Sequence, residues 1–392
     1  MGDVENKKFE TKIIRALSPQ DRAFLSEDFP AMLLPAAEAI QEGELVAFPT
    51  ETVYGLGADA FNESAIAKIY EAKGRPQDNP LIVHLADLED LSSIAREIPE
   101  EAIRLFKRFS PGPLSIILKV RPELPDIATA GLDTVAVRFP GNDIARELIR
   151  LSKTPLVAPS ANISGRPSPT LAEHVYADLQ GKIPFIIDGG PCRIGVESTV
   201  LDLSTEQACI LRPGGISREA LEEALGRKVY ASAELIGNHQ PKAPGMKYKH
   251  YAPRAKVRIL PESLEYTNIL SSIKRNFPAK IGFYLNNCSA DILRKSLKAE
   301  KDFMAKPIEI LGEEDFEDPS RLSNLKSTRE GIYVFAFGEG SIDAAHYLFA
   351  AFRWFDEIDV KLIYAQELLK GKEASAYMNR LRKAAADESL PQ

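Results

Sequence analysis

The sequence has no apolar run long enough to cross a membrane. A spanning helix needs about 18–20 consecutive apolar residues, and no segment of the chain approaches that length. Residues 1–10 are charged and contain no apolar core of the kind that marks a secretory signal. These two absences predict a cytoplasmic protein that makes no membrane contact.

Cysteine is also scarce. The chain has three cysteines, Cys192, Cys209 and Cys288, which are odd in number and widely spaced. Such a set supplies neither a disulfide framework nor a Cys-x-x-Cys zinc site, so reduced thiols are expected. No group of His, Cys and Asp residues has metal-ligand spacing, which argues against a structural zinc.

An excess of positive charge is missing as well. Lys and Arg number 49 against 56 Asp and Glu, which gives a formal net charge of −7. Nonspecific binding of nucleic acid depends on clustered Lys and Arg, so stable nucleic-acid binding is not expected. A local basic pocket remains compatible with this charge.

The composition that is present is typical of a soluble globular protein, with 44% hydrophobic and 27% charged residues. The 392 residues exceed what one hydrophobic core usually supports, so two domains are expected. Regular patterning weakens between residues 228 and 255, where Pro241, Pro244 and Pro253 interrupt any regular element. We therefore predict a first domain at residues 1–227, a linker at 228–255 and a second domain at 256–392.

In the first domain, helical patterns alternate with β-rich runs. Asn62 is a good N-cap, and Gly74 a good C-terminal cap, for a helix through residues 65–70. The alternation predicts an α/β fold in which helices pack on a twisted mixed sheet. Further helices are expected at 30–41, 99–109, 142–152 and 217–226, and strands at 45–48, 81–85, 114–120, 134–139, 155–158, 184–188, 198–203 and 209–212.

The second domain shows the same alternation over fewer elements. It is predicted to be a smaller α/β domain with a parallel sheet. Its strands are expected at 257–260, 281–285, 332–337 and 360–364, and its helices near 262–275, 289–298, 341–354 and 373–386.

Neither of the common phosphate-binding loops is present. No Gly-x-x-x-x-Gly-Lys-[Ser/Thr] segment occurs, and Gly55-Leu56-Gly57 is not followed by the third glycine of a dinucleotide fingerprint. A nucleotide would have to be held in another way. The segments that stand out instead are Phe48–Gly57, Lys73–Pro80 with His84, Pro111–Pro113, Pro159–Gly165, and Gly189–Pro191 with Glu197–Thr199.

The order and spacing of these segments resemble the YrdC family in its long, two-domain form. The resemblance covers residues 30–226 and includes the segment Ala243–Pro253. Members of that family are threonylcarbamoyl-AMP synthases, which combine ATP, L-threonine and bicarbonate or CO2 and release pyrophosphate. Their product feeds the modification of the adenosine beside the anticodon of certain tRNAs.

The resemblance implies a YrdC-like catalytic domain followed by a Rossmann-like C-terminal domain. It also implies ATP, L-threonine and bicarbonate or CO2 as substrates, and downstream tRNA threonylcarbamoyl transferase proteins as partners. Mg2+ would arrive with ATP, since this ion is usually held by substrate phosphates and few protein ligands. The second domain has no glycine-rich dinucleotide fingerprint, so the resemblance gives its fold and no cofactor.

The segment Lys73-Gly74-Arg75 has two interpretations. Cations and a glycine are both favoured at a helix C-terminus, so the segment could serve only as a cap. It could also bind phosphate, because fixed cations stabilise the charge that builds up when a carbamate attacks the α-phosphorus of ATP. The loop that follows adds Asn79 as a further donor. The resemblance favours the second interpretation.

Ser160 and Asn162 follow an apolar strand, where turns rich in Ser and Asn are common. At positions i and i+2 of extended backbone, their side chains project to one side and can bind phosphate or metal-bound oxygens. The resemblance assigns catalysis to Lys73, Arg75, Ser160 and Asn162. It assigns ATP contacts to Arg75, Asn79, Thr134, Ser160, Asn162, Arg212 and Tyr251.

For the amino-acid substrate, the resemblance indicates Thr52, His84, Arg138 and Ser198. Arg138 could bind the α-carboxylate through two parallel hydrogen bonds, while the hydroxyl groups and His84 could bind the threonine hydroxyl or the nascent carbamate. Structural alternatives exist for two of them: His84 could be a core histidine in an apolar strand, and Thr52 a turn residue.

The linker mixes aromatic and basic residues around Tyr248, His250 and Tyr251, a pattern that fits an ordinary surface segment or a base-stacking contact. The resemblance suggests that it covers the mouth of the catalytic cleft, with Tyr251 as the closing residue. Two other functions stay open: an RNA-binding module, which the net charge disfavours, and a carbamoyltransferase of hydrogenase maturation. Chains of the latter kind carry paired Cys-x-x-Cys motifs, which are absent here.

Overall fold

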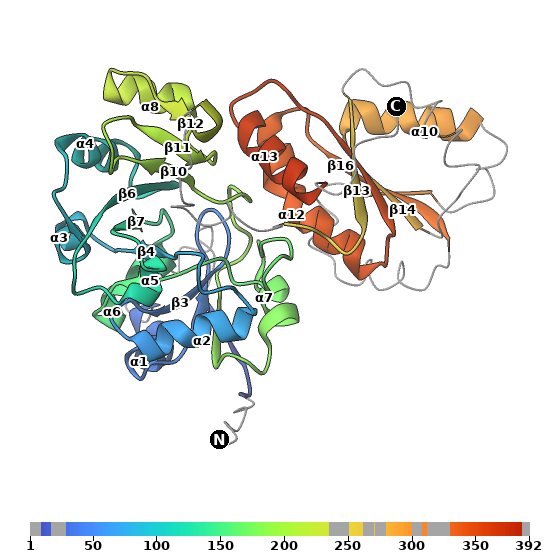
Figure 1. The fold of residues 1–392 in the computed structure, drawn as a ribbon. Coiled ribbons are helices and arrows are strands. Elements are labelled where there is room, and N and C mark those ends of the chain that lie inside the picture. Colours follow the sequence, from blue (N-terminus) through green and yellow to red (C-terminus); the bar gives the residue numbers. More distant parts are fainter. Residues whose placement is uncertain are drawn as a thin grey trace. The chain divides into compact units, whose positions relative to one another are not determined.

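Figure 1 shows the computed structural model, which describes residues 9–16, 29–234, 251–261, 270, 280–299, 308–311 and 330–385. Contacts divide the chain into two compact units. The first comprises residues 1–164 and 168–248, and the second comprises residues 165–167 and 249–392. The described residues contain no helix that is long and apolar enough to cross a membrane.

The first unit is built on one mixed sheet, as the sequence predicts. Its strand order is β1-β9-β2-β3-β8-β4-β7-β6-β10-β11-β12, with β5 paired to β6, and both parallel and antiparallel ladders occur. The strands are β1 Lys12–Arg15, β2 Val46–Phe48, β3 Gly55–Asp59, β4 Ile82–His84, β5 Ala95–Arg96, β6 Leu114–Val120, β7 Thr134–Arg138, β8 Leu156–Val157, β9 Phe185–Asp188, β10 Thr199–Asp202, β11 Cys209–Arg212 and β12 Tyr230–Ala231.

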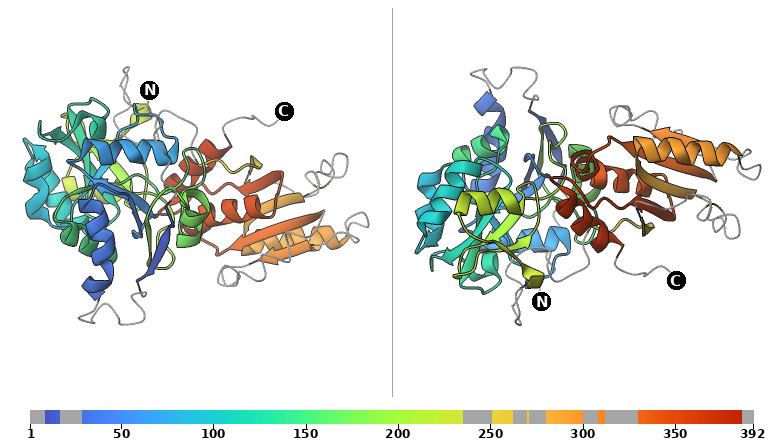
Figure 2. Two further views of the ribbon diagram at one scale, coloured as in Figure 1. Left: turned by 90° about the horizontal axis from the view of Figure 1, so that it is seen from below. Right: turned by 90° about the horizontal axis from the view of Figure 1, so that it is seen from above.

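Helices cover both faces of this sheet (Figures 1 and 2). Successive residues of β2 show the two faces: Val46 and Phe48 belong to the apolar cluster under α1 and α6, whereas Ala47 belongs to the cluster under α2 and α4. The helices are α1 Phe29–Gln41, α2 Glu63–Lys73, α3 Leu91–Ile94, α4 Glu100–Phe109, α5 Asp126–Thr129, α6 Asp143–Ser152, α7 Ala172–Leu179 and α8 Arg218–Leu225, with short 3-10 turns η3 Leu88–Asp90 and η4 Ser232–Glu234.

The predicted caps of α2 are confirmed. The Asn62 side chain accepts a hydrogen bond from the backbone nitrogen of Ala65 at 3.1 Å. Gly74 ends the helix with φ 60°, the left-handed conformation that glycine tolerates best. Both features are local, and therefore readable from the sequence.

Strand β3 and helix α7 were not predicted. The sequence of β3, Gly-Leu-Gly-Ala-Asp, has no β-branched residue to signal a strand. Its glycines leave room for an aromatic ring, since a Cβ at Gly57 would lie 2.8 Å from Phe48 Cε1. The strand therefore depends on a tertiary contact that its own composition does not reveal.

The second unit contains a parallel sheet of five described strands in the order β13-β17-β14-β16-β15. The predicted parallel sheet is thus confirmed. The strands are β13 Lys256–Leu260, β14 Lys280–Asn286, β15 Ile308–Leu311, β16 Gly331–Phe337 and β17 Leu362–Gln366, and the helices are α10 Asn287–Ala299, α12 Ser341–Glu357 and α13 Ala374–Ala384.

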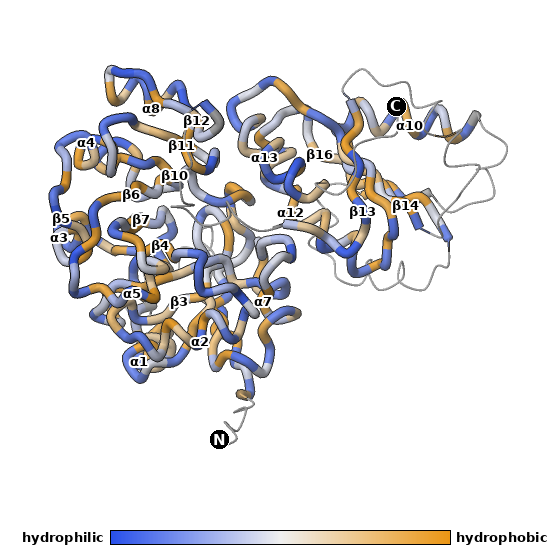
Figure 3. Tube along the Cα trace, viewed as in Figure 1, coloured by the Kyte–Doolittle hydropathy of each residue, from blue (hydrophilic) through white to orange (hydrophobic). Residues whose placement is uncertain are grey.

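The Rossmann-like detail of this unit is not confirmed. In the dinucleotide-binding fold the first strand lies inside the sheet, whereas β13, the first described strand here, lies at an edge. Strand β15 was not predicted from the sequence, and the helix expected near 262–275 falls almost entirely outside the described residues. Figure 3 shows alternating hydrophilic and hydrophobic residues along α8 and α10, the pattern of helices with one buried face.

Candidate active site

Three strands of the first sheet bring polar side chains into one row. His84 ends β4 and is paired with Arg138 at the end of β7, which is in turn paired with Ser115 of β6. Residues directly opposite one another in neighbouring strands share a face of the sheet. The register therefore places an imidazole, a guanidinium and a hydroxyl side by side.

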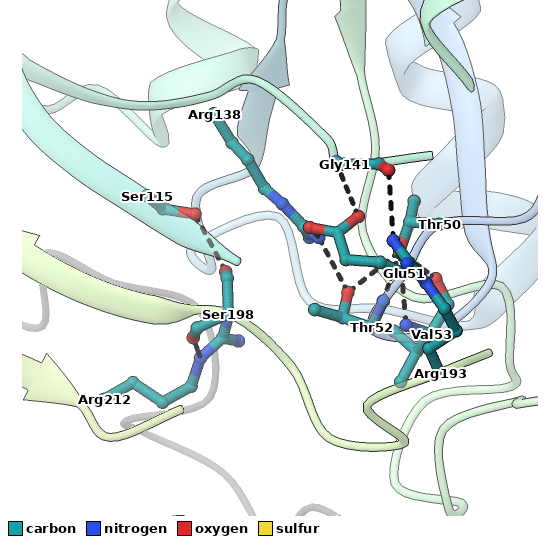
Figure 4. Close-up of polar contacts among 10 residues, drawn as sticks. All are labelled: Thr50, Glu51, Thr52, Val53, Ser115, Arg138, Gly141, Arg193, Ser198 and Arg212. Carbon is teal, nitrogen blue, oxygen red and sulfur yellow. Dashed lines mark hydrogen bonds and ion pairs between the residues drawn. The ribbon is translucent and has the colours of Figure 1, made fainter. Parts of the chain in front are cut away.

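Arg138 is the centre of a buried group that we call the arginine cluster: Glu51, Thr52, Arg138 and Gly141 (Figure 4). The Arg138 Nη2 atom donates to Glu51 Oε1 at 2.8 Å and to Thr52 Oγ1 at 2.9 Å. Glu51 Oε2 accepts from the backbone nitrogen of Gly141 at 2.8 Å. Both N–H groups of Nη2 are thus occupied, so a carboxylate would have to bind other N–H groups of Arg138, and the predicted clamp stays a prediction.

Ser198 lies in a second polar group of the same unit. Its hydroxyl is 2.8 Å from the hydroxyl of Ser115 and accepts from Arg212 Nη2 at 3.1 Å, and its carbonyl accepts from Arg212 Nε at 3.1 Å (Figure 4). The predicted threonine contact Ser198 and the predicted ATP contact Arg212 therefore touch. Ser115 was missed by the sequence reading, because a serine inside an apolar strand carries no recognisable motif.

His84 is fully enclosed and neutral. Its Nδ1 lies 3.1 Å from the carbonyl oxygen of Ile82, which can only accept, so Nδ1 carries the proton. Burial, followed by the nearby charge of Arg138, lowers the pKa of His84 to about 3. The unprotonated Nε2 is therefore an acceptor at neutral pH.

The structure also joins Lys73 to Ser160 and Asn162, a set that we call the lysine cluster. Lys73 is buried, and its Nζ donates to the backbone carbonyls of Ser160 and Asn162. The Ser160 hydroxyl donates to Asn162 Oδ1, and the backbone nitrogen of Ser164 donates to the Lys73 carbonyl at 2.8 Å. Lys73 is therefore more than a helix cap, since it ties the end of α2 to the loop after β8.

Arg75 is held against the loop that it begins. Its Nη2 donates to the carbonyls of Asn79 and Pro80 at 3.3 and 3.1 Å. Among the described residues, Asn79 Nδ2, Thr134 Oγ1 and Arg138 Nε are buried and have no hydrogen-bond partner. Buried donors without partners are rare and costly, so three of the predicted ligand contacts are left open for a polar ligand.

Two family models match the chain. One, described as telomere recombination, covers residues 38–214, and the other, described as the C-terminal domain of threonylcarbamoyl-AMP synthase, covers residues 216–386. The threonylcarbamoyl-AMP synthases of Pyrococcus abyssi and Bacillus subtilis are 44% and 42% identical to the chain. Each alignment spans 351 residues, 89% of this chain and 92% of the relative. The chain belongs to the threonylcarbamoyl-AMP synthase family.

A solved structure of a family member supports the same assignment. The crystal structure of P. abyssi Sua5 complexed with L-threonine is 41% identical and matches with a TM-score of 0.74 over 96% of this chain and 98% of that chain. The resemblance to the long, two-domain YrdC form is thereby confirmed. Neither match assigns a role to an individual residue of this chain.

Tyr251 lies in the second unit of this family member. Its ring stacks on Phe349 with a centroid separation of 5.3 Å, and the charged groups of Arg380 and Lys383 lie 5.8 and 5.9 Å from its centroid. Its ATP contact and closing role stay predictions. The other linker residues named above, at 235–250, lie outside the described residues.

The described part of the chain contains no group of three or more His, Cys, Asp or Glu side chains that could hold a metal ion. The oxygen atoms of Ser160 and Asn162 are hard donors of the kind that Mg2+ accepts alongside phosphate and water. They are the residues here that fit an ion arriving with a nucleotide.

Proposed function

We propose that the chain makes L-threonylcarbamoyl-AMP and pyrophosphate from ATP, L-threonine and bicarbonate or CO2. In this proposal the product serves the modification of the adenosine beside the anticodon of tRNA, and a downstream threonylcarbamoyl transferase receives it. Family membership supports the reaction class. The geometry of the first unit supports the division of labour between its two clusters.

One observation carries the proposal: a single short segment joins the two clusters. Thr52 Oγ1 accepts from Arg138 in the arginine cluster. Two residues later, the carbonyl of Tyr54 accepts at 2.8 Å from the backbone nitrogen of Ala161, between the two polar residues of the lysine cluster. Groups suited to an amino acid and groups suited to a triphosphate are thereby held by one piece of backbone.

In the proposed reaction, the amine of threonine bonds to the carbon of CO2 and loses a proton, which gives a carbamate. A carbamate oxygen then bonds to the α-phosphorus as the bond to pyrophosphate breaks. Lys73 and Arg75 offset the negative charge on the phosphoryl oxygens and the leaving group. Arg138 and Thr52 hold the amino acid, and much of the acceleration comes from proximity. Mg2+ bound with ATP would add further charge neutralisation beside Ser160 and Asn162.

The test is to incubate the protein with ATP, radiolabelled bicarbonate and either threonine or serine. Labelled adenylate is expected when the preferred amino acid is present, and none is expected when that amino acid is left out. The variant Arg75→Ala should lower turnover about a hundredfold, the scale found when a fixed charge-stabilising donor is removed. Arg121→Ala, which removes an arginine of an exposed ion pair in the same unit, is the matched control. Absence of labelled adenylate with every amino acid would refute the proposal.

A further inference from the structure

Glu51 forms a buried ion pair that has no role in the function proposed so far. Its side chain and that of Arg138 are 3% and 5% exposed, and the N–O separation is 2.8 Å. Taking two charged groups out of water has a free-energy cost that their mutual attraction often does not repay. A buried ion pair is therefore weak evidence that the two residues serve stability alone. The Arg121–Glu123 pair, with side chains 41% and 56% exposed, shows the ordinary surface form in the same unit.

The hydrogen bonds of Thr50 set the direction of the Thr52 proton, and the Thr50 oxygen also accepts longer bonds from the backbone nitrogens of Thr52 and Val53 at 3.1 and 3.2 Å. The Thr50 hydroxyl has one proton, which it donates to the carbonyl of Val53 at 2.6 Å. The contact of 2.8 Å between the Thr50 and Thr52 hydroxyls must therefore use the proton of Thr52. Thr52 has no second proton, and its oxygen already accepts from Arg138. Toward a ligand, Thr52 can only offer a remaining lone pair.

Glu51 holds Arg138, the group that occupies one lone pair of Thr52. One N–H of Arg138 Nη2 goes to Glu51 and the other to Thr52, while the second carboxylate oxygen is bound by the Gly141 backbone (Figure 4). The guanidinium therefore cannot rotate without breaking a charge-assisted bond. In this orientation Arg138 Nε keeps an N–H that no described residue accepts.

We propose that Glu51 is a positioning residue for amino-acid recognition. It locks Arg138 beside Thr52, whose proton is committed to Thr50, and the pocket then selects a ligand with a carboxylate for Arg138 and an N–H or O–H donor for Thr52. This inference rests on the proposed function and deepens it. An amino acid whose donor is replaced by a methylated, acceptor-only group should lose affinity, because it would present a lone pair to a lone pair.

The variant Glu51→Gln tests the lock with almost no change of shape. Its amide has one accepting oxygen, but two donors face it, Arg138 Nη2 and the Gly141 nitrogen. Either orientation of the amide sets N–H against N–H. We expect the KM for threonine to rise roughly tenfold to a hundredfold, the scale of one lost hydrogen bond to a charged group, with the KM for ATP unchanged.

The measurement uses the full chain in the labelled-adenylate assay, together with threonine binding by calorimetry. Glu123→Gln, at the exposed pair, is the control and should leave both KM values unchanged. In an Arg138→Gln background, Glu51→Gln should raise the KM for threonine little further, because both changes break the same ion pair. A merely structural role would instead lower the melting temperature and raise both KM values together.

Two outcomes would overturn the inference: a wild-type threonine KM in Glu51→Gln, or equal losses for threonine and ATP. If that variant does not fold, Glu51→Asp decides, since it keeps both acceptor oxygens on a shorter side chain and should still raise the threonine KM selectively. A wild-type protein that makes no adenylate would refute the proposed function instead, so the two failures are distinguishable.

Discussion

The buried, neutral His84 predicts a specific acid sensitivity of the first unit. Burial and the charge of Arg138 lower its pKa from 6.5 to about 3. In the unfolded chain the imidazole takes up its proton near the ordinary pKa, whereas in the folded chain it resists protonation down to the lower value. The unfolded state therefore binds more protons in this window. The stability that the neutral His84 contributes is fully present above about pH 6.5 and is lost as the pH falls toward 3.

The size of the effect follows from the two pKa values. Each pH unit inside the window costs about 1.4 kcal/mol once the unfolded histidine is charged. Between about pH 7.5 and about pH 5 the loss attributable to His84 is about 2 kcal/mol. His84→Asn should abolish this part of the pH dependence, because the amide does not titrate and its N–H can still donate to the carbonyl of Ile82.

The assay is urea unfolding of wild type and His84→Asn at the two pH values, without ligand. Circular dichroism follows both units, and fluorescence of the single tryptophan, Trp354 in α12, follows the second unit alone and serves as the internal control. The wild-type unfolding free energy should fall about 2 kcal/mol more than that of the variant, in the first unit alone. Equal pH dependence in the two proteins would refute the buried-neutral assignment.

Three further outcomes are expected. Thr134→Val removes a buried hydroxyl that no described residue pairs with, so melting of the free protein should not worsen while ATP affinity in calorimetry falls; a weaker fold would show an unseen partner. Gly74→Ala should lower the unfolding free energy measured in urea by about 1 kcal/mol, because alanine is strained at a φ of 60°. No steric clash adds to this cost, since nothing lies within 4 Å of an added Cβ. Burial raises the pKa of Glu373 to about 7, so this residue makes the second unit less stable as the pH rises from 4.5 toward 7. Glu373→Gln should therefore reduce the pH dependence of the unfolding free energy that Trp354 fluorescence reports. An unchanged pH dependence would contradict this account.

Features that depend on neighbours in sequence were predicted well. The caps of α2, the amphipathic helices and most strands follow from contacts between residues a few positions apart, or from the period of apolar residues. Strand β3 was missed because its glycines matter only in relation to Phe48. Edge strand β1 was missed because it pairs with β9, more than 170 residues later.

The candidate site divides in the same way. Lys73, Ser160 and Asn162 could be named from motifs, but the bonds from Lys73 Nζ to two carbonyls of a distant loop could not. Glu51 stands inside a recognised motif, yet its pairing with Arg138 spans 87 positions and depends on the order of strands in the sheet. A sequence pattern specifies residue types, whereas a hydrogen bond across the fold requires the register.

By itself, the sequence determined the family, the α/β class and the identity of most residues around the two clusters, because motif composition and apolar period are local properties. Tertiary structure alone decided which donor faces which acceptor. Long-range strand pairing set His84 beside Arg138 and closed Glu51 onto that arginine. The pairing of donors with acceptors is set in this way only when buried polar groups must hydrogen-bond to one another in a folded interior.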